Sequence, residues 1–258
     1  MNSNEAQVSI SIVSHNQGVL VEKLLKDIDA LNGFLQIKEV IVTCNIKESN
    51  VFKTRNVPLR LIVNTSPKGF GANHNTAFKQ SSAEYFCVIN PDVRLRNNPF
   101  PLMIDVAKAQ DTGVVVPLVY SSKGQIEDSI RHFPKLSTIL KKTFGSHSYK
   151  WNIPDTSSCF PIDWGAGIFM LFRREVYEFL GGFDENYFLY YEDADICTRL
   201  WKLEKIVMAC SSVIITHDAQ RASHRQFKYF LWHLASFIRY QTRYIFRYPD
   251  INTIFKKK

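Results

Sequence analysis

The sequence predicts an α/β fold with a mostly parallel central sheet. Short, β-branched apolar segments alternate with segments whose apolar residues recur at helical spacing, which is the pattern of successive β-α units. Several apolar segments end directly in polar residues, as strands do at the ligand-binding edge of such a sheet. With 258 residues, of which 45% are hydrophobic, the chain is long enough to bury a complete core.

The first half of the chain is expected to hold four strands and two helices. Val8–Val13 is apolar and β-branched and breaks at Ser14, so it is expected to be an internal strand. Apolar residues at helical spacing follow, and Asn32-Gly33 ends that helix. The same reasoning predicts strands at 39–43, 59–63 and 85–89 and a helix at 72–80.

The second half of the chain is less regular. A helix near 101–109 and a strand near 113–120 come first, whereas the stretch 121–158 gives no clear pattern and is interpreted as loop with short helix above the site. A strand at 168–172, a helix at 174–180 and the turn Gly181-Gly182 follow. A last strand at 212–216 leads directly into His217.

Polar side chains follow the ends of the predicted strands. His15, Cys44 and Asn64 come after three of them, and Asn90-Pro91-Asp92 comes after the buried strand 85–89. Asn-Pro-Asp alone is a common turn. After a buried strand of a parallel sheet, however, a carboxylate stands where a metal-bound diphosphate would lie, which favours a functional role.

A second acidic cluster, Glu192-Asp193-Ala194-Asp195, precedes a helix-like segment at 196–201. The helix dipole favours acidic residues at that place, so the cluster also has a structural interpretation. Clustered carboxylates repel one another and raise the pKa of at least one of them, which suits a general base. Together with Asp92, the cluster predicts an enzyme acting on a sugar nucleotide.

The basic residues are concentrated at the C-terminal end. Residues 1–198 hold 20 Lys and Arg against 21 Asp and Glu, and residues 199–258 hold 12 against 3, so the net charge of +8 divides into −1 and +9. A neutral body with a basic end indicates an anionic partner, either nucleic acid or an anionic membrane surface.

The chain is expected to stay in the cytosol. It has no basic start followed by an apolar stretch, and no run near the roughly 18 apolar residues that a spanning helix needs. The five cysteines form no CxxC pair and are interpreted as free buried thiols in a reducing compartment. They are Cys44, Cys87, Cys159, Cys197 and Cys210.

An ordered set of motifs makes the chain resemble the inverting glycosyltransferases of family 2, which have the GT-A fold. The motifs lie at 8–16, 68–75, 90–92, 163–167, 181–185, 192–195 and His217, and cover about residues 8–225 in family order. Asn90-Pro91-Asp92 and Arg131-His132-Phe133-Pro134 are typical of bacterial rhamnosyltransferases that extend lipid-linked O-antigen or cell-wall glycans.

The resemblance implies a nucleotide-sugar donor bound over the first half of the sheet. The implied donor is dTDP-β-L-rhamnose, with a UDP-hexose or a galactofuranose nucleotide as the alternative. The Gly69-Phe70-Gly71 loop is too short for a dinucleotide fingerprint and lacks the Lys-Ser/Thr of a P-loop, so it is interpreted as a close backbone approach to the nucleotide. The residues expected to bind the donor are Ser14, His15, Asn16, Gly69, Phe70, Gly71, Asn73, Asn90 and Asp92.

The resemblance also implies a divalent cation, Mg²⁺ or Mn²⁺, which offsets the charge on the leaving diphosphate. Asp92 is the expected carboxylate ligand and His217 the second ligand, because Mn²⁺ also accepts imidazole. At the end of a buried strand, His217 also has a structural interpretation. Asn90 replaces the first Asp of an Asp-x-Asp motif, which predicts weaker metal binding, and Cys44 replaces an Asp, so no nucleoside contact is assigned to it.

The acceptor implied by the resemblance is a polyprenyl-diphosphate-linked glycan, such as N-acetylglucosaminyl-diphospho-undecaprenol. Asp193 would take the proton from the acceptor hydroxyl, with Glu192 beside it. Trp164 could equally be a core residue. The residues expected to bind the acceptor are Asp163, Trp164, Gly165 and Asp195.

The predicted organisation is a GT-A domain over 1–225, with a donor-binding half over 1–120 and an acceptor-binding half over 121–225, and a basic amphipathic helical tail over 226–258. On the tail, apolar residues share one face and basic residues another. Such a helix either packs on the domain with a solvated charged face or binds an anionic membrane, which would make the protein cytoplasmic and peripheral on the inner face of the bacterial inner membrane. The apolar set is Phe230, Leu231, Leu234, Phe237, Ile238 and Ile245, and the basic set is Lys228, Arg239, Arg243 and Arg247.

Two functions of other classes stay open. A nucleic-acid-binding protein would use the basic end, but the acidic cluster would repel phosphates unless a metal intervenes, so no nucleic-acid partner is expected. An inactive relative that only binds nucleotide is compatible with Asn90 and Cys44.

Overall fold

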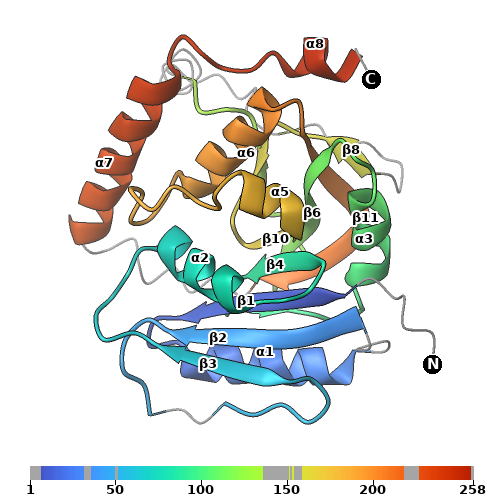
Figure 1. The fold of residues 1–258 in the computed structure, drawn as a ribbon, viewed down its shortest axis with the longest axis vertical. Coiled ribbons are helices and arrows are strands. Elements are labelled where there is room, and N and C mark those ends of the chain that lie inside the picture. The colour runs from blue at the N-terminus through green and yellow to red at the C-terminus, as the bar shows by residue number, and fades with distance from the viewer. Residues whose placement is uncertain are drawn as a thin grey trace.

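The computed structural model describes residues 7–31, 36–49, 52–135, 151, 153, 159–217 and 227–256. The strands are β1 (Val8–Ser14), β2 (Ile37–Cys44), β3 (Leu59–Val63), β4 (Tyr85–Ile89), β5 (Val93–Arg94), β6 (Thr112–Ser121), β7 (Ile130–Arg131), β8 (Cys159–Pro161), β9 (Trp164–Gly165), β10 (Phe169–Arg173) and β11 (Ile206–His217). The helices are α1 (Gly18–Ala30), α2 (Phe70–Gln80), α3 (Phe100–Ala107), α5 (Arg174–Phe179), α6 (Glu192–Lys202), α7 (Phe227–Tyr244) and α8 (Ile251–Lys256). Figure 1 shows their arrangement.

The α/β fold with a mostly parallel sheet is confirmed. Among the described residues, nine strands form one sheet in the order β3-β2-β1-β4-β10-β6-β11-β5, with β8 paired to β11, while β7 and β9 form a separate pair. Strands β1 to β4 pair with one another in parallel, and so do β6 and β11. Strand β10 is antiparallel to both β4 and β6 and joins the two parallel groups.

Strand β4 shows how the sequence builds two cores, one on each face of the sheet. Tyr85, Cys87 and Ile89 point to one face, where α1 and α3 cover them. Phe86 and Val88 point to the other face, where side chains of α2, α6 and α7 close the second core. Because every residue of β4 is buried, the strand is apolar throughout instead of alternating.

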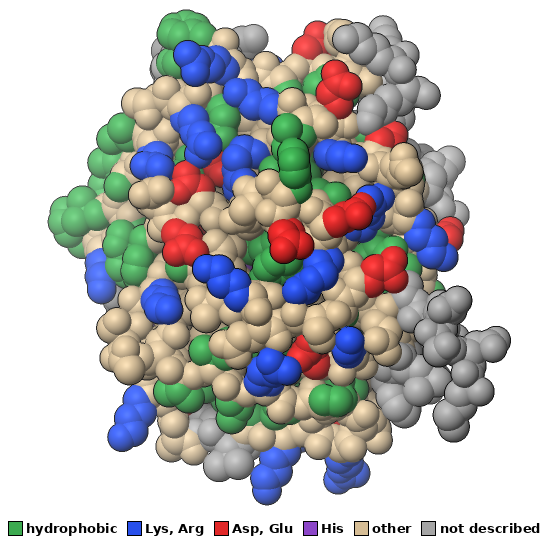
Figure 2. Space-filling model, in the orientation of Figure 1, with side chains coloured by type: hydrophobic (Ala, Val, Ile, Leu, Met, Phe, Trp, Pro, Cys, Tyr) green, Lys and Arg blue, Asp and Glu red, His purple; other side chains and the backbone are tan. Residues whose placement is uncertain are grey.

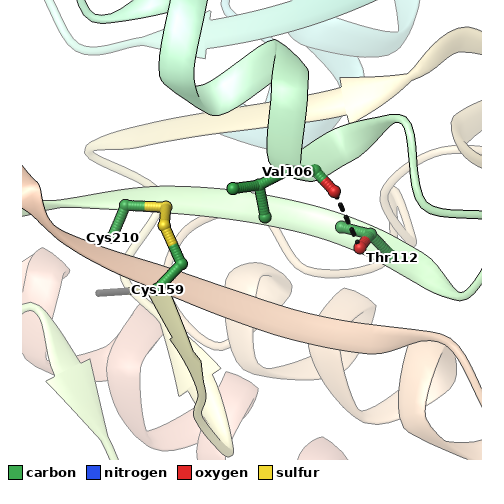
Figure 3. The surroundings of a disulfide bond; sticks show 4 residues. All are labelled: Val106, Thr112, Cys159 and Cys210. Atoms are coloured by element: carbon green, nitrogen blue, oxygen red, sulfur yellow. Dashed lines mark hydrogen bonds between the residues drawn. A yellow bond between two sulfur atoms is a disulfide. The ribbon is translucent and has the colours of Figure 1, made fainter.

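A disulfide between Cys159 and Cys210 corrects the prediction that all five cysteines are free thiols. It joins β8 to β11, as Figure 3 shows. The two cysteines are 51 residues apart, and antiparallel pairing of β8 with β11 places them directly opposite each other. Sequence spacing cannot reveal that register. Cys44, Cys87 and Cys197 are free and buried, as predicted.

The C-terminal helix α7 packs on the domain through its polar and tyrosine face. Ser236, Tyr240, Gln241 and Tyr244 are buried, and the Tyr240 hydroxyl pairs with the Thr198 hydroxyl of α6 at 2.7 Å. The opposite face exposes a row of apolar side chains, which we call the outer stripe. It consists of Phe227, Phe230, Leu231, Leu234 and Ile238.

The outer stripe lies on the surface of the molecule. Figure 2 shows hydrophobic side chains along the left edge, where Figure 1 places α7. The predicted amphipathic helix is therefore present, but its apolar face points away from the domain. No helix in the described part of the chain is long and apolar enough to cross a membrane. The predicted domain boundary at 225/226 lies outside the described residues.

Candidate functional site

A cavity of about 580 Å³ lies at the carboxyl ends of β1, β2 and β4, where a parallel sheet binds its ligands. Both predicted polar centres, Asp92 and the pair Glu192 and Asp193, open onto it. The remaining lining residues are Val13, His15, Asn16, Gln17, Asn45, Lys68, Phe70, Asn73, Asn90, Pro91, Ala166, Gly167, Ile168, Phe188, Leu189, Tyr190, Tyr229 and Trp232.

Asn45, which was not predicted to bind a ligand, organises one end of the cavity. Its side-chain oxygen accepts hydrogen bonds from the Lys68 backbone N–H at 2.8 Å and from the Asn64 amide at 2.9 Å. Its side-chain nitrogen donates to the Lys68 carbonyl oxygen at 2.9 Å. Asn64 in turn donates to Asn73 at 2.7 Å. This network ties the loop before α2 to the end of β2, beside the cavity.

Six of the nine predicted donor-binding residues line the cavity, and three support its wall. Ser14 is buried, and its hydroxyl donates to Glu48 Oε2 at 2.9 Å. A Cβ added at Gly69 would lie 2.7 Å from the Phe188 carbonyl oxygen, and one at Gly71 would lie 2.6 Å from Phe183 Cβ. The two glycines therefore let the loop and α2 approach the segment 183–188. The six that line it are His15, Asn16, Phe70, Asn73, Asn90 and Asp92.

Asp92 and His217 are brought together by strand pairing. Strand β5 begins directly after Asp92, and His217 stands opposite Val93 in the β5–β11 pair. His217 Nε2 lies 3.1 Å from Asp92 Oδ2. The other carboxylate oxygen, Asp92 Oδ1, is buried and has no hydrogen-bond partner among the described residues. Such an oxygen is free to accept a further ligand.

Glu127 completes this group, although no motif in the sequence marks it. His217 Nδ1 lies 2.7 Å from Glu127 Oε2, so the ring stands between two carboxylates. Burial lowers the pKa of His217, but the hydrogen bonds and charges of Asp92 and Glu127 outweigh it and raise that pKa above its ordinary value. With Nδ1–H donated to Glu127, Nε2 is left to face Asp92. His217 itself is not among the residues that line the cavity.

An oxygen and an imidazole nitrogen on neighbouring side chains suit a divalent cation such as Mn²⁺. The orphaned Asp92 Oδ1 fits that interpretation. Within the described ranges, no group of three or more His, Cys, Asp or Glu side chains is arranged to hold a metal. The protein would thus supply two ligands, which leaves further positions to a bound ligand or water.

Asp193 is held in place by two backbone N–H groups. Its Oδ2 accepts from Gly167 at 3.0 Å and its Oδ1 from Ala194 at 2.8 Å. Tyr190 and Tyr191, directly before α6, have φ values of 72° and 67°. Two consecutive non-glycine residues in the left-handed region are costly and are typical of functional sites. This turn starts α6 so that its first residues face the cavity.

Burial raises the pKa of both acidic groups at the start of α6. For Asp193, the hydrogen bond from Gly167 and the charge of Arg131 work against that rise without cancelling it. For Glu192, the rise is larger, because the negative charge of Asp193 adds to the effect of burial. Glu192 Oε2 is buried and has no partner among the described residues. A carboxylate with a raised pKa is a stronger proton acceptor than an ordinary one, which suits a general base.

The structure does not bring the four predicted acceptor-binding residues to the cavity. Asp163 accepts the Phe133 backbone N–H, and the indole N–H of Trp164 donates to the His132 carbonyl oxygen from a buried position. Gly165 packs against the side chain of Val116. These residues hold the segment 130–133 over the sheet, so Trp164 is a core residue.

Asp195 does not line the cavity and lies buried between helices α6 and α7. It is fully buried, and it pairs with Arg199 at 2.7 Å and Arg243 at 3.1 Å. The Tyr244 hydroxyl donates to the same carboxylate at 2.7 Å. Asp195 therefore fastens α7 to α6, because all its partners come from these two helices.

Comparisons with known proteins agree with this geometry. The family model "Glycosyl transferase family 2" matches residues 9–180. The chain is 30% identical over 253 residues to the rhamnosyltransferase WbbL of Escherichia coli strain K12, covering 92% of this chain and 93% of that protein. It is 27% identical over 152 residues to the N-acetylglucosaminyl-diphospho-decaprenol L-rhamnosyltransferase of Mycobacterium tuberculosis, covering 55% of this chain and 49% of that protein.

Solved structures share the fold at low sequence identity. The crystal structure of GalNAc-T7 with UDP, GalNAc and Mn²⁺ matches with a TM-score of 0.72 and 12% identity, over 93% of this chain and 48% of that one. The chain thus spans about half the length of that enzyme.

Proposed function

Because the chain belongs to glycosyl transferase family 2 and is a glycosyltransferase, we propose that it transfers L-rhamnose from dTDP-β-L-rhamnose to a lipid-linked sugar, such as N-acetylglucosaminyl-diphospho-undecaprenol. The observation that carries the proposal is one cavity lined by Asp92, which pairs with His217, and by Asp193, in a chain whose full-length similarity is to a rhamnosyltransferase. The product would extend an O-antigen or a related surface glycan.

In the proposed reaction, Asp193 accepts the proton of the acceptor hydroxyl as that oxygen attacks the anomeric carbon of the donor sugar. The bond from this carbon to the diphosphate breaks in the same displacement, so the configuration inverts. The Gly167 and Ala194 N–H groups hold the Asp193 carboxylate in a fixed orientation towards the acceptor, and as backbone amides they do not protonate it. Glu192 lies beside it as a second buried carboxyl.

The donor would lie over the ends of β1, β2 and β4, against His15, Asn45 and Lys68. Asp92 and His217 would hold Mg²⁺ or Mn²⁺, which offsets the negative charge that develops on the leaving diphosphate. With Asn90 in place of a second carboxylate, the metal would bind mainly together with the donor diphosphate.

The outer stripe of α7 would rest on an anionic membrane, on the cytoplasmic face of the bacterial inner membrane. Apolar side chains on the outward face of a helix, flanked by exposed Lys228, Arg239 and Arg243, are typical of helices that lie in a membrane interface. A polyprenyl-linked acceptor lies in the same interface. The stripe and the acceptor would therefore meet without any transmembrane segment.

The proposal is tested with the purified protein and a panel of dTDP- and UDP-sugars, each with and without Mn²⁺. A ligand that binds the folded state raises the melting temperature, by an amount that grows with its concentration over its Kd. We expect the largest shift with dTDP-rhamnose plus Mn²⁺, and transfer of one rhamnose to an N-acetylglucosaminyl-diphospho-lipid, detected by mass spectrometry. If transfer occurs only from a UDP-sugar, the chain is still a glycosyltransferase, but rhamnose is excluded as the sugar that it transfers.

A further inference from the structure

The cavity extends beyond the sheet onto α7, a helix that lies outside the matched family segment 9–180. Tyr229 and Trp232 line the same cavity as Asp193, together with Phe188 and Leu189. Phe188 also adjoins the loop before α2, because its carbonyl oxygen accepts the Phe70 N–H at 2.9 Å. None of these aromatic residues belongs to the polar groups described above.

Three aromatic rings form a platform at this place. The rings of Trp232 and Phe188 lie 4.5 Å apart at 32°, close to parallel, and Tyr229 meets Trp232 edge-on at 5.3 Å. Such packing fixes the orientation of the indole and leaves it part-exposed towards the cavity. The flat, apolar face of a ring in a polar cavity suits the C–H face of a sugar.

A cation stands beside the platform. The Lys228 ammonium lies 4.6 Å from the centre of the Trp232 ring, and its side chain is exposed on the helix. An ammonium group binds phosphate as a point charge. The next turns of α7 carry Leu231, Leu234 and Ile238 of the outer stripe. One helix therefore presents an aromatic ring, a cation and an apolar row in succession.

The platform is tied mechanically to the candidate base. The Ser236 hydroxyl donates to the Leu189 carbonyl oxygen at 2.9 Å, and the His233 ring lies 5.3 Å from the rings of both Tyr190 and Tyr191. The segment 188–191 runs directly into Glu192 and Asp193. A ligand seated on Trp232 would thus lie at a fixed place relative to Asp193.

We propose that Trp232, with Phe188 and Tyr229, forms the acceptor subsite for a sugar attached to a lipid diphosphate, and that Lys228 binds its diphosphate. The sugar ring packs against the part of Trp232 that lines the cavity, with its hydroxyl towards Asp193, and the lipid leaves along the outer stripe. This inference rests on the proposed function, because it assigns the acceptor of the same reaction.

The test uses steady-state kinetics of the full chain with two water-soluble acceptors. One carries N-acetylglucosamine on a short alkyl diphosphate, and the other carries it on the same alkyl group without the diphosphate. We expect Trp232→Ala to raise the acceptor KM at least tenfold for both compounds while the donor KM stays within twofold. Trp232→Phe should recover most of the affinity, because it keeps a flat ring.

Lys228→Ala separates the two parts of the subsite. It should raise the KM of the diphosphate acceptor severalfold and leave that of the neutral acceptor unchanged. Phe179→Ala, at a ring 76% exposed on α5 and outside the cavity, is the matched control and should change neither value. The inference is overturned if acceptor KM values of Trp232→Ala stay within twofold of wild type, or if donor and acceptor KM rise equally. Absence of transfer by wild type would instead refute the proposed function.

Discussion

Asp193 is a single carboxylate on which the proposed chemistry depends, and its replacement by Asn tests that role. Asn keeps the shape and can still accept one of the Gly167 and Ala194 N–H groups with its single side-chain oxygen, but it cannot take up a proton. We expect Asp193→Asn to lower kcat by about 10²- to 10⁴-fold, the range attributed to general base catalysis. The thermal shift with donor should persist, and a variant that retains full turnover would exclude Asp193 as the base.

The same residue predicts the direction of the pH dependence. A base works only when deprotonated, so kcat/KM should fall as the pH decreases through the pKa of Asp193. Because burial raises that pKa, the acid limb should lie above the ordinary aspartate value of about 3.9. Arg131→Gln removes a charge that lowers this pKa and should move the limb to higher pH. A limb that moves to lower pH would contradict the assignment.

Replacing Glu127 should change the affinity of the protein for the proposed metal ion. By accepting the Nδ1–H of His217, Glu127 holds Nε2 as the nitrogen that faces Asp92. Removing such a partner of a metal-binding histidine typically weakens binding about 10- to 100-fold. We expect this loss for Glu127→Ala in Mn²⁺ titrations followed by electron paramagnetic resonance with dTDP present. Glu127→Gln keeps an acceptor oxygen and should bind Mn²⁺ nearly as wild type; equal affinity of the Ala variant would refute the role.

At the scale of elements, Asn75 joins α2 to the turn after α5. Its side-chain oxygen accepts from the Tyr177 hydroxyl at 2.7 Å and the Phe183 N–H at 3.0 Å, and its nitrogen donates to the Phe183 carbonyl oxygen at 2.9 Å. The turn includes Gly182 at φ 70°, where an added Cβ would lie 2.2 Å from Asn75 Oδ1. Only glycine allows this close approach of the turn to α2.

Asn75→Ala should therefore lower the free energy of unfolding by about 3 kcal/mol, because several buried polar groups lose their partners at once. Tyr177→Phe removes only one of the hydrogen bonds and should cost about 1 kcal/mol. Urea unfolding of the two variants measures both values. If Asn75→Ala costs no more than Tyr177→Phe, the turn is held by its hydrophobic contacts instead.

Local sequence pattern was sufficient for strands β1 to β4, β6 and β10, and for the end of β11. Strand β4 occupies the predicted residues 85–89 because five apolar residues bounded by polar ones have no other regular solution in an α/β fold. Strands β5, β7, β8 and β9 were not predicted, since they are two or three residues long and exist only through their partners. The Cys159–Cys210 bridge depends on one of those pairings.

The sequence pattern predicted an amphipathic α7 and left open whether its apolar face packs on the domain or meets a membrane. The structure exposes the face with Leu231, Leu234 and Ile238, and the domain takes the face with Tyr240 and Tyr244. Those tyrosines bury large rings and still satisfy their hydroxyls on Thr198 and Asp195. For the same reason Trp232 was not expected at the cavity, because nothing in the helical period indicates what the helix packs against.

At the scale of the whole molecule, the outward stripe predicts binding to membranes. Leu234, which is 41% exposed on α7, should contribute to insertion, so Leu234→Asp should lower the fraction bound to vesicles that contain anionic lipid. Leu102→Asp is the matched control, because Leu102 is 39% exposed on helix α3. Flotation measures both variants, and added salt should weaken binding of the wild type by screening its basic residues. Equal flotation of the two variants would exclude α7 as the contact.

The proposed contact of the outer stripe with a membrane would also determine which concentration controls the rate. An enzyme held at a bilayer by one helix searches a plane for its acceptor instead of a volume. Turnover on a lipid-linked acceptor should then follow the mole fraction of that acceptor in the vesicle and fall when inert phospholipid is added at constant total acceptor. A short soluble acceptor should show no such dilution, because it reaches Trp232 from the water.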